Sequence, residues 1–139
     1  MMTMQSAIDQ DSGAQLSRQY STFTVGTFFF GIEVLEVQEV LRYQDMTPVP
    51  LAPDMVQGLI NLRGQIVTAV NLRRRLEFPD WPEDRRPMNV VLRLGGEALS
   101  LLVDQVGEVV IVNDDTFEPP PETLRGPMRE LTTGAYKLA

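Results

Sequence analysis

The sequence predicts an all-β fold built from two similar small barrels or sandwiches. Short runs rich in Val, Ile, Leu and Phe alternate with glycine-containing corners along most of the 139 residues, which is typical of strands joined by tight turns. The pattern V-x-x-V-x-E-V also occurs twice at an offset of 69 residues, over 34–40 and 103–109. Two copies of one pattern indicate two similar units.

The N-terminal elements follow from local composition. Residues 1–19 lack the basic start and apolar centre of a secretory signal, and we expect them to form a mobile tail. Residues 20–25 and 28–33 are predicted to form a hairpin around Gly26-Thr27, because glycine accepts the backbone that such turns require.

Residues 34–40 are predicted to form a short helical turn. This places Glu36 and Glu39 outward and Val37 and Val40 inward. A second short helix is predicted from Pro53 to Gln57.

Strands are predicted at 59–62, 65–72, 89–94, 98–104 and 108–112. Arg63-Gly64 forms the corner of the first pair and Gly95-Gly96 that of the next. The prolines and charges of Leu76–Asn89 predict an exposed linker, in which Trp81 either anchors a partner or pins the linker to its own core. Pro119–Pro121 should be extended, followed by a short helix within 122–131.

The C-terminus predicts an incomplete second unit. Gly134–Leu138 resembles Gly58–Leu62, but the chain stops where the first unit continues into another strand. We therefore expect a shortened or incomplete sequence with an unpaired strand edge.

Composition excludes several classes of function. Twelve Lys and Arg against 19 Asp and Glu give a net charge of −7, which opposes nucleic-acid binding despite the cluster Arg73–Arg75. No apolar run approaches the ~20 residues of a membrane span. Histidine and cysteine are absent, which removes the commonest general base and the thiol nucleophile.

No cofactor or metal is expected. There is no phosphate-binding glycine loop, and Asp114, Asp115 and Glu118 are spaced unlike a calcium loop. A carboxylate-based hydrolase stays open as a remote alternative, and it would require Glu39 and Asp104 to converge across the two units.

The segment Gly58–Leu76, GLINLRGQIVTAVNLRRRL, resembles the core signature of the CheW family. The similarity extends to FGIEVLEVQEV before it and LSLLVDQVGEVV after it, and it spans about residue 20 to the end. Thr68 and Asn71 depart from the signature, which usually has Pro and Asp there. The matching positions are Gly58, Ile60, Asn61, Leu62, Arg63, Gly64, Leu72 and Arg73.

The resemblance implies two intertwined, five-stranded SH3-like β-barrels, the second shortened. The first barrel would cover about 20–75, the linker about 76–88 and the second barrel about 89–139. It also implies a non-catalytic adaptor that couples the cytoplasmic tips of chemoreceptors to the histidine kinase CheA, at receptor arrays on the inner face of the membrane. Two alternatives stay open: an adaptor of a pilus or other non-flagellar pathway, and a CheW-like segment of a larger chemotaxis protein.

The resemblance also implies a partner-binding site. The arginine of NLRG and the glutamate of V-x-E-V, here Arg63 and Glu39, are associated with signalling in the family, and we expect them within salt-bridge distance. An apolar groove beside them would accept a receptor helix pair, although ordinary core packing is the alternative for each apolar residue. The expected partner-binding residues are Arg63, Glu39, Asn61, Gly64, Val37, Val40, Leu41, Ile60, Leu62, Val103 and Val106.

Overall fold

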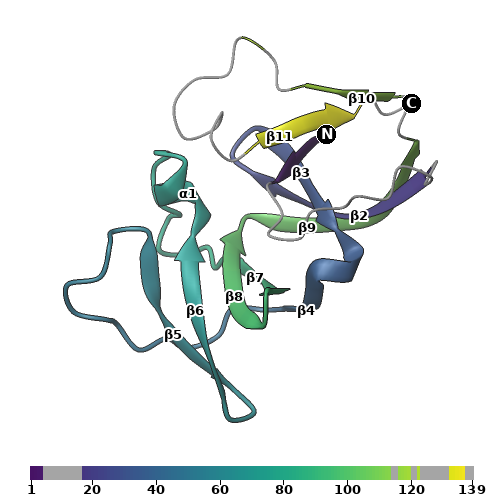
Figure 1. Cartoon of the computed structure of the whole chain (residues 1–139). Coiled ribbons are helices and arrows are strands. Elements are labelled where there is room, and N and C mark those ends of the chain that lie inside the picture. Colours follow the sequence, from purple (N-terminus) through teal and green to yellow (C-terminus); the bar gives the residue numbers. More distant parts are fainter. Residues whose placement is uncertain (5–16, 114–115, 120–121, 123–131, 137–139) are drawn as a thin grey trace.

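A computed structural model of the chain describes residues 1–4, 17–113, 116–119, 122 and 132–136. These residues form two β-sheets (Figure 1), which confirms the all-β prediction. In the described part of the chain, no helix has the length and apolar character that a membrane crossing requires.

Sheet A lies in the upper part of Figure 1 and has the strand order β10-β11-β1-β3-β2-β9. Its strands are β1 (Met2–Met4), β2 (Ser17–Val25), β3 (Phe28–Glu33), β9 (Gln105–Asn113), β10 (Phe117–Glu118) and β11 (Thr132–Tyr136).

Sheet B lies below it and has the order β4-β7-β8-β6-β5. Two short helical segments flank its strands: the 3-10 turn η1 (Val34–Glu36) and the helix α1 (Leu72–Arg75). The strands are β4 (Val37–Leu41), β5 (Val56–Leu62), β6 (Gln65–Asn71), β7 (Met88–Leu94) and β8 (Glu97–Val103).

Each sheet takes strands from both sides of the predicted linker at 76–88. The hairpin of β2 and β3 pairs with β9, whereas the hairpin of β7 and β8 lies between β4 and β6. The predicted barrel boundaries at 20–75 and 89–139 therefore follow the order of the chain and not the membership of the sheets. The two units are interleaved.

The repeated V-x-x-V-x-E-V pattern marks the two places where the chain crosses between sheets. The first copy leads from β3 in sheet A through η1 to β4 in sheet B, and the second leads from β8 in sheet B to β9 in sheet A. Both crossover strands begin with a β-bulge, at Gln38 in β4 and at Gly107-Glu108 in β9. A bulge bends a strand and changes the face that its side chains point to. The repeated pattern therefore corresponds to a bent strand at each crossover.

Sheet B carries apolar clusters on both of its faces. One cluster fills the space between the sheets and includes Phe23, Phe30, Leu92 and Leu101. A second lies on the other face of sheet B and includes Ile60, Leu62, Val67, Val91 and Leu102. Burial on both faces explains the consecutive apolar residues Val90–Leu92 of β7 and Leu101–Val103 of β8.

The hairpin predictions are confirmed. Strands meet at Gly26-Thr27, at Arg63-Gly64 and at Gly95-Gly96, close to the predicted bounds. The linker is more anchored than predicted, because Leu76 and Asn89 at its two ends are buried.

One of the two helix predictions is partly right and the other is wrong. The turn predicted over 34–40 is helical only to Glu36, and β4 then begins at Val37. Glu36, which we predicted to point outward, is 1% exposed, and Val40, which we predicted to point inward, is 39% exposed. The helix predicted over 53–57 is absent: β5 begins at Val56 because its backbone pairs with β6.

The expectation of a mobile tail over 1–19 is wrong at both of its ends. Met2–Met4 form β1 between β3 and β11, and β2 begins at Ser17. The predicted open strand edge is also wrong, since β11 pairs with β1 on one side and with β10 on the other. The helix expected within 122–131 and the acidic pair Asp114-Asp115 lie outside the described residues.

Candidate partner-binding site

The bulge at the start of β4 determines where Glu39 points. Val37 pairs with Leu92, whose side chain faces the core between the sheets, but the extra residue Gln38 shifts the register so that Glu39 pairs with Val91. Val91 belongs to the core on the other face of sheet B. Without the bulge Glu39 would share the face of Val37.

The hairpin between β5 and β6 holds the partner of Glu39 at its tip. Arg63 and Gly64 both have positive φ values, 50° and 88°, which is the geometry of a two-residue type I′ turn. The side chain of Asn61 accepts a hydrogen bond from the backbone N–H of Gly64 at 2.9 Å. Glycine suits this backbone, whereas arginine is strained in it.

The predicted salt bridge between Arg63 and Glu39 is confirmed. Nη2 of Arg63 donates to Oε2 of Glu39. The amide of Gln38 lies 3.4 Å from the same Oε2 and 3.4 Å from Oε1 of Gln65. The arginine side chain is 70% exposed and the glutamate 22%. The more buried Glu39 therefore fixes the position of a cation that stays at the surface.

The apolar residues predicted to line a groove separate into two groups. Ile60, Leu62 and Val103 are buried in the cores, so a partner cannot contact them without unfolding the sheet, and the groove prediction is corrected for these three. The partly buried residues pack against the cores but keep some exposed surface: Val37, Leu41 and Val106. Of the seven apolar residues, Val40 is the most exposed.

Sequence reasoning missed Leu35, which is 90% exposed on η1, next to the crossover that carries Glu39. The offset of 69 aligns Leu35 with Asp104, an apolar residue against a carboxylate within an otherwise similar pattern. This mismatch was the signal in the sequence that could have identified Leu35 as a candidate surface residue.

A second Arg–carboxylate cluster lies at the other crossover and is mostly buried. Arg73 of α1 donates to Asp104 from Nε at 2.9 Å and from Nη2 at 2.7 Å. The indole N–H of Trp81 and the backbone N–H of Gly26 also donate to this carboxylate, at 2.7 and 2.8 Å. The Arg73 guanidinium lies over the Trp81 ring at 5.4 Å.

These contacts control the charge of Asp104. Burial on its own would raise the pKa of this carboxyl, but the hydrogen bonds from Arg73, Gly26 and Trp81 together lower the pKa below its usual value. Trp81 therefore pins the linker to its own core, one of the two roles left open by the sequence.

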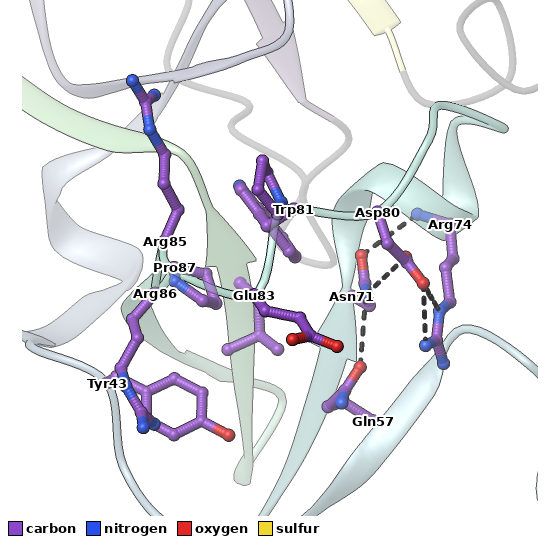
Figure 2. Close-up of a pocket in the computed structure, with 12 residues that line it drawn as sticks. Tyr43, Gln57, Asn71, Arg74, Asp80, Trp81, Glu83, Arg85, Arg86 and Pro87 are labelled. Atoms are coloured by element: carbon purple, nitrogen blue, oxygen red, sulfur yellow. Dashed lines mark hydrogen bonds and ion pairs between the residues drawn. The ribbon is translucent and has the colours of Figure 1, made fainter.

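Beside Trp81 lies an open cleft of about 330 Å³ (Figure 2). Arg74 and Asp80 form an ion pair at 3.0 Å on one wall, and the hydrogen bond from Arg74 lowers the pKa of Asp80. The guanidinium of Arg86 stacks on Tyr43 at 4.7 Å on the opposite side.

Asn71 connects this wall to sheet B and explains one departure from the signature. Its Oδ1 caps α1 by accepting from the backbone N–H of Arg74 at 3.1 Å, as an aspartate would. Its Nδ2 donates to Gln57 and Asp80 at 3.2 and 3.4 Å. Thr68, the other departure, lies in β6 between β5 and β8.

The carboxylates of Glu39 and Asp104 each form hydrogen bonds with neighbouring groups of their own site. Glu39 contacts Arg63 and Gln38, whereas Asp104 contacts Arg73, Trp81 and Gly26. The two carboxylates proposed for a hydrolase thus have different neighbours. Within the described ranges, no group of three or more acidic side chains is placed to hold a metal ion.

Comparison with known proteins gives one consistent result. The family model of the CheW-like domain matches residues 19–139. The chain is 30% identical to the chemotaxis protein CheW of Klebsiella aerogenes, over 91% of this chain and 76% of that protein. It is 31% identical to CheW of Rhizobium meliloti, over 87% and 78% of the two chains.

The fold has a solved counterpart. The crystal structure of the scaffolding protein TtCheW from Thermoanaerobacter tengcongensis superposes with a TM-score of 0.76 and 24% identity, covering 88% of this chain and 84% of that one. The interleaved sheets, the NLRG corner and the extent of the family match agree, and the chain belongs to the CheW family.

Proposed function

We propose that this chain is a non-catalytic adaptor that couples the cytoplasmic tips of chemoreceptors to the regulatory domain of the histidine kinase CheA. The relatives are named as chemotaxis and scaffolding proteins, which supports a role in chemotaxis signalling. Such an adaptor would work at receptor arrays on the cytoplasmic side of the membrane.

The observation that carries the proposal is the way Arg63 is displayed. The backbone of this residue is strained at a turn position that suits Asn or Gly, and its side chain is 70% exposed. A solvated salt bridge of this kind contributes only about 0–1 kcal/mol, which does not exceed the cost of the strain. A charge kept at such a position is consistent with use by a partner.

The negative net charge of the chain makes the exposed Arg63 distinctive. The chain carries a net charge of −7, so a partner with an acidic patch would be repelled by most of the surface and attracted to a local basic tip. Charge patterns of this type determine the orientation of encounter more than the affinity. The ion pair with Glu39 limits the rotamers of Arg63, which lowers the entropy cost of binding.

The apolar part of the proposed surface is Leu35 with Val40. Leu35 lies on η1 and Val40 on β4, the strand that carries Glu39, and their side chains are 90% and 39% exposed. Val37, Leu41 and Val106 would contribute only their exposed edges. Val40 pairs with Val90 and so points to the opposite face of sheet B from Glu39, and β4 is the edge strand of that sheet. We therefore place the amphipathic helix of a receptor along this edge, where it would contact the apolar side chains on one face and the charge on the other.

The test is a calorimetric titration of the purified chain against the CheA regulatory domain from the same organism. We expect saturable binding of the wild type and at least about tenfold weaker binding of Arg63→Glu, because reversing a charge at an interface costs several kcal/mol. Leu35→Asp should weaken binding to a receptor-tip helical hairpin.

Arg93→Glu is the matched control. Arg93 is an exposed arginine shortly before the Gly95-Gly96 hairpin, and the substitution makes the same change in net charge. Equal weakening by Arg63→Glu and Arg93→Glu would indicate a general charge effect and contradict the site. A folded wild type that binds neither the kinase domain nor the receptor hairpin would contradict the function.

A further inference from the structure

The cleft beside Trp81 lies away from the surface proposed for partners. Gln57 of β5 and Asn71 of β6 line the cleft, and both stand at the opposite end of the β5–β6 hairpin from its tip at Arg63-Gly64. The function proposed above therefore leaves the side chains of this cleft without a role.

The linker closes the cleft from one side and sheet B forms its floor. Most of the lining residues come from 80–87, and the others come from the loop after β4, from α1 and from β5, β6 and β8. Leu102, Asn71 and Pro87 are buried beneath it. The volume of about 330 Å³ falls within the range of small-molecule sites, which is roughly 300–1,000 Å³.

One wall of the cleft is a network of polar groups that already bind one another. Arg74 pairs with Asp80 at 3.0 Å. Asn71 donates to Asp80 and to Oε1 of Gln57, and its own Oδ1 accepts from the backbone N–H of Arg74 (Figure 2). This wall shapes the cleft but offers a ligand few unused hydrogen-bonding groups.

The facing side carries donors that the chain itself does not use. The guanidinium of Arg86 stacks on the ring of Tyr43 at 4.7 Å, and no carboxylate of the described residues lies within salt-bridge distance of it. The hydroxyl of Tyr43 and Nε2 of Gln57 likewise form no hydrogen bond within the described part of the chain. Figure 2 shows Tyr43 and Arg86 across the cleft from Asn71 and Arg74.

These donors favour an anion with two oxygens in one plane. A guanidinium held flat against an aromatic ring presents its N–H groups in that plane, which matches a carboxylate. The stacking also limits the rotamers of Arg86, so less entropy is lost on binding. The lining carries three arginines and two carboxylates, a local positive charge in a chain whose net charge is −7.

The apolar part of the lining determines the rest of the ligand. Pro82, Pro87 and Leu102 lie beside the donors. The indole N–H of Trp81 donates to Asp104, so the ring offers a ligand only apolar surface. Flat and aliphatic surfaces of this kind suit a flat apolar group attached to the carboxylate.

From these observations we propose that the cleft binds a small carboxylate that carries a flat apolar group, such as an aromatic acid. The carboxylate accepts hydrogen bonds from Arg86, and Tyr43 and Gln57 are the further donors within the cleft. The flat group packs against Trp81 and the two prolines. The proposal does not depend on the coupling of receptors to the kinase.

The test titrates the whole chain with benzoate at constant ionic strength by isothermal titration calorimetry. We expect saturable binding with a Kd of about 1 mM, because a ligand of this size in an open cleft has a low affinity. Trp81 is the only tryptophan of the chain, so a shift of the single indole N–H signal in an NMR spectrum locates the ligand.

Three further probes separate charge from shape. Benzamide has the same ring without the charge, whereas acetate and inorganic phosphate have the charge without the ring. Each should bind at least about tenfold more weakly than benzoate, since each lacks one of the two features that the cleft recognises.

Arg86→Gln removes the cation and should weaken benzoate binding by at least about tenfold. Arg93→Gln is the matched control, because Arg93 is also an exposed arginine but lies outside the lining of the cleft. It should bind benzoate as the wild type does. Both variants should unfold at the wild-type urea concentration, which separates a lost contact from a lost fold.

Several results would overturn the proposal. Equal affinities for benzoate and benzamide would remove the carboxylate from recognition, and phosphate binding as tight as benzoate binding would assign a site for a bare oxyanion. Equal weakening by Arg86→Gln and Arg93→Gln would indicate a general charge effect. Binding without a shift of the Trp81 signal would place benzoate elsewhere, and no saturable binding by the folded wild type would show that the cleft holds no such ligand.

Discussion

The crossover from β3 to β4 and the crossover from β8 to β9 both follow V-x-x-V-x-E-V and both begin with a bulge, but they use their carboxylates differently. At the first, Glu39 meets Arg63 at an exposed hairpin tip, and Leu35 points into solvent. At the second, Asp104 stands at the position of Leu35 and accepts hydrogen bonds from Arg73, Trp81 and Gly26.

The difference shows that burial and the number of hydrogen-bond donors determine whether an ion pair links distant segments or only orients one side chain. Asp104 connects α1, the linker and the β2–β3 hairpin, so its pair holds distant parts of the chain together. Glu39 orients one side chain that remains 70% exposed. We interpret the first crossover as the surface for partners and the second as the structural clamp.

The largest expected effect follows from removing the charge of Asp104. Asp104→Asn leaves Arg73 without its carboxylate and turns an amide toward donors, and it should lower the free energy of unfolding by about 3 kcal/mol. Urea denaturation measures this. Asp84→Asn, on the exposed part of the linker, is the control and should change it by less than about 0.5 kcal/mol; similar values for both would refute the clamp.

A smaller loss is expected at the bulge of the second crossover. A Cβ on Gly107 would lie 2.7 Å from Oγ1 of Thr22, so Gly107→Ala should destabilise the protein by about 2 kcal/mol through a forced backbone shift. Gln38→Ala at the equivalent bulge of β4 introduces no new atom and should be nearly neutral. Equal midpoints of thermal denaturation for the two variants would contradict the steric restriction at Gly107.

Strong acid should weaken the contacts of Asp104 at the second crossover. The pKa of Asp104 and that of Asp80 are lowered in the folded protein, so their contribution is complete above the unfolded value of about 3.9 and is lost as pH falls through the folded value. Urea midpoints from pH 7 down to pH 3 should show the gap between wild type and Asp104→Asn narrowing only below about pH 4. A difference in urea midpoint that stays constant from pH 7 to pH 3 would contradict the role of ionised Asp104 in stability.

The smallest effect is a gain at the first crossover. Arg63→Asn relieves the left-handed backbone and creates the favoured Asn-Gly turn, so the free energy of unfolding should rise by up to about 1 kcal/mol while kinase binding falls. Glu39→Gln, which removes only the ion pair, should change stability by about 0–1 kcal/mol. A clear loss of stability in Arg63→Asn would show that Arg63 is structural.

Local features of the fold could be predicted from sequence because they depend on neighbouring residues. Gly26, Gly64 and Gly95 mark hairpins whose turns need positive φ, and the Arg63–Glu39 contact followed from the resemblance. The helix predicted over Pro53–Gln57 was wrong because pairing of Val56 with Val70 overrode a weak local signal.

The remaining features depend on residues far apart in the chain. Nothing local to Met2–Met4 indicates a strand, because its partners are Phe30, Gly31 and the segment 132–135. The burial of Ile60, Leu62 and Val103 depends on which sheets face each other, and periodicity alone does not distinguish a groove from a core.

The interleaving of the sheets also constrains how the chain is made. Thr22 of β2 bonds to the carbonyl of Glu108 in β9, 86 residues later. At a synthesis rate of roughly 5–20 residues per second, the first hairpin waits about 4 to 17 seconds on the ribosome before its neighbour exists. During that interval neither sheet can close, and the nascent hairpin exposes an apolar face that a chaperone could bind.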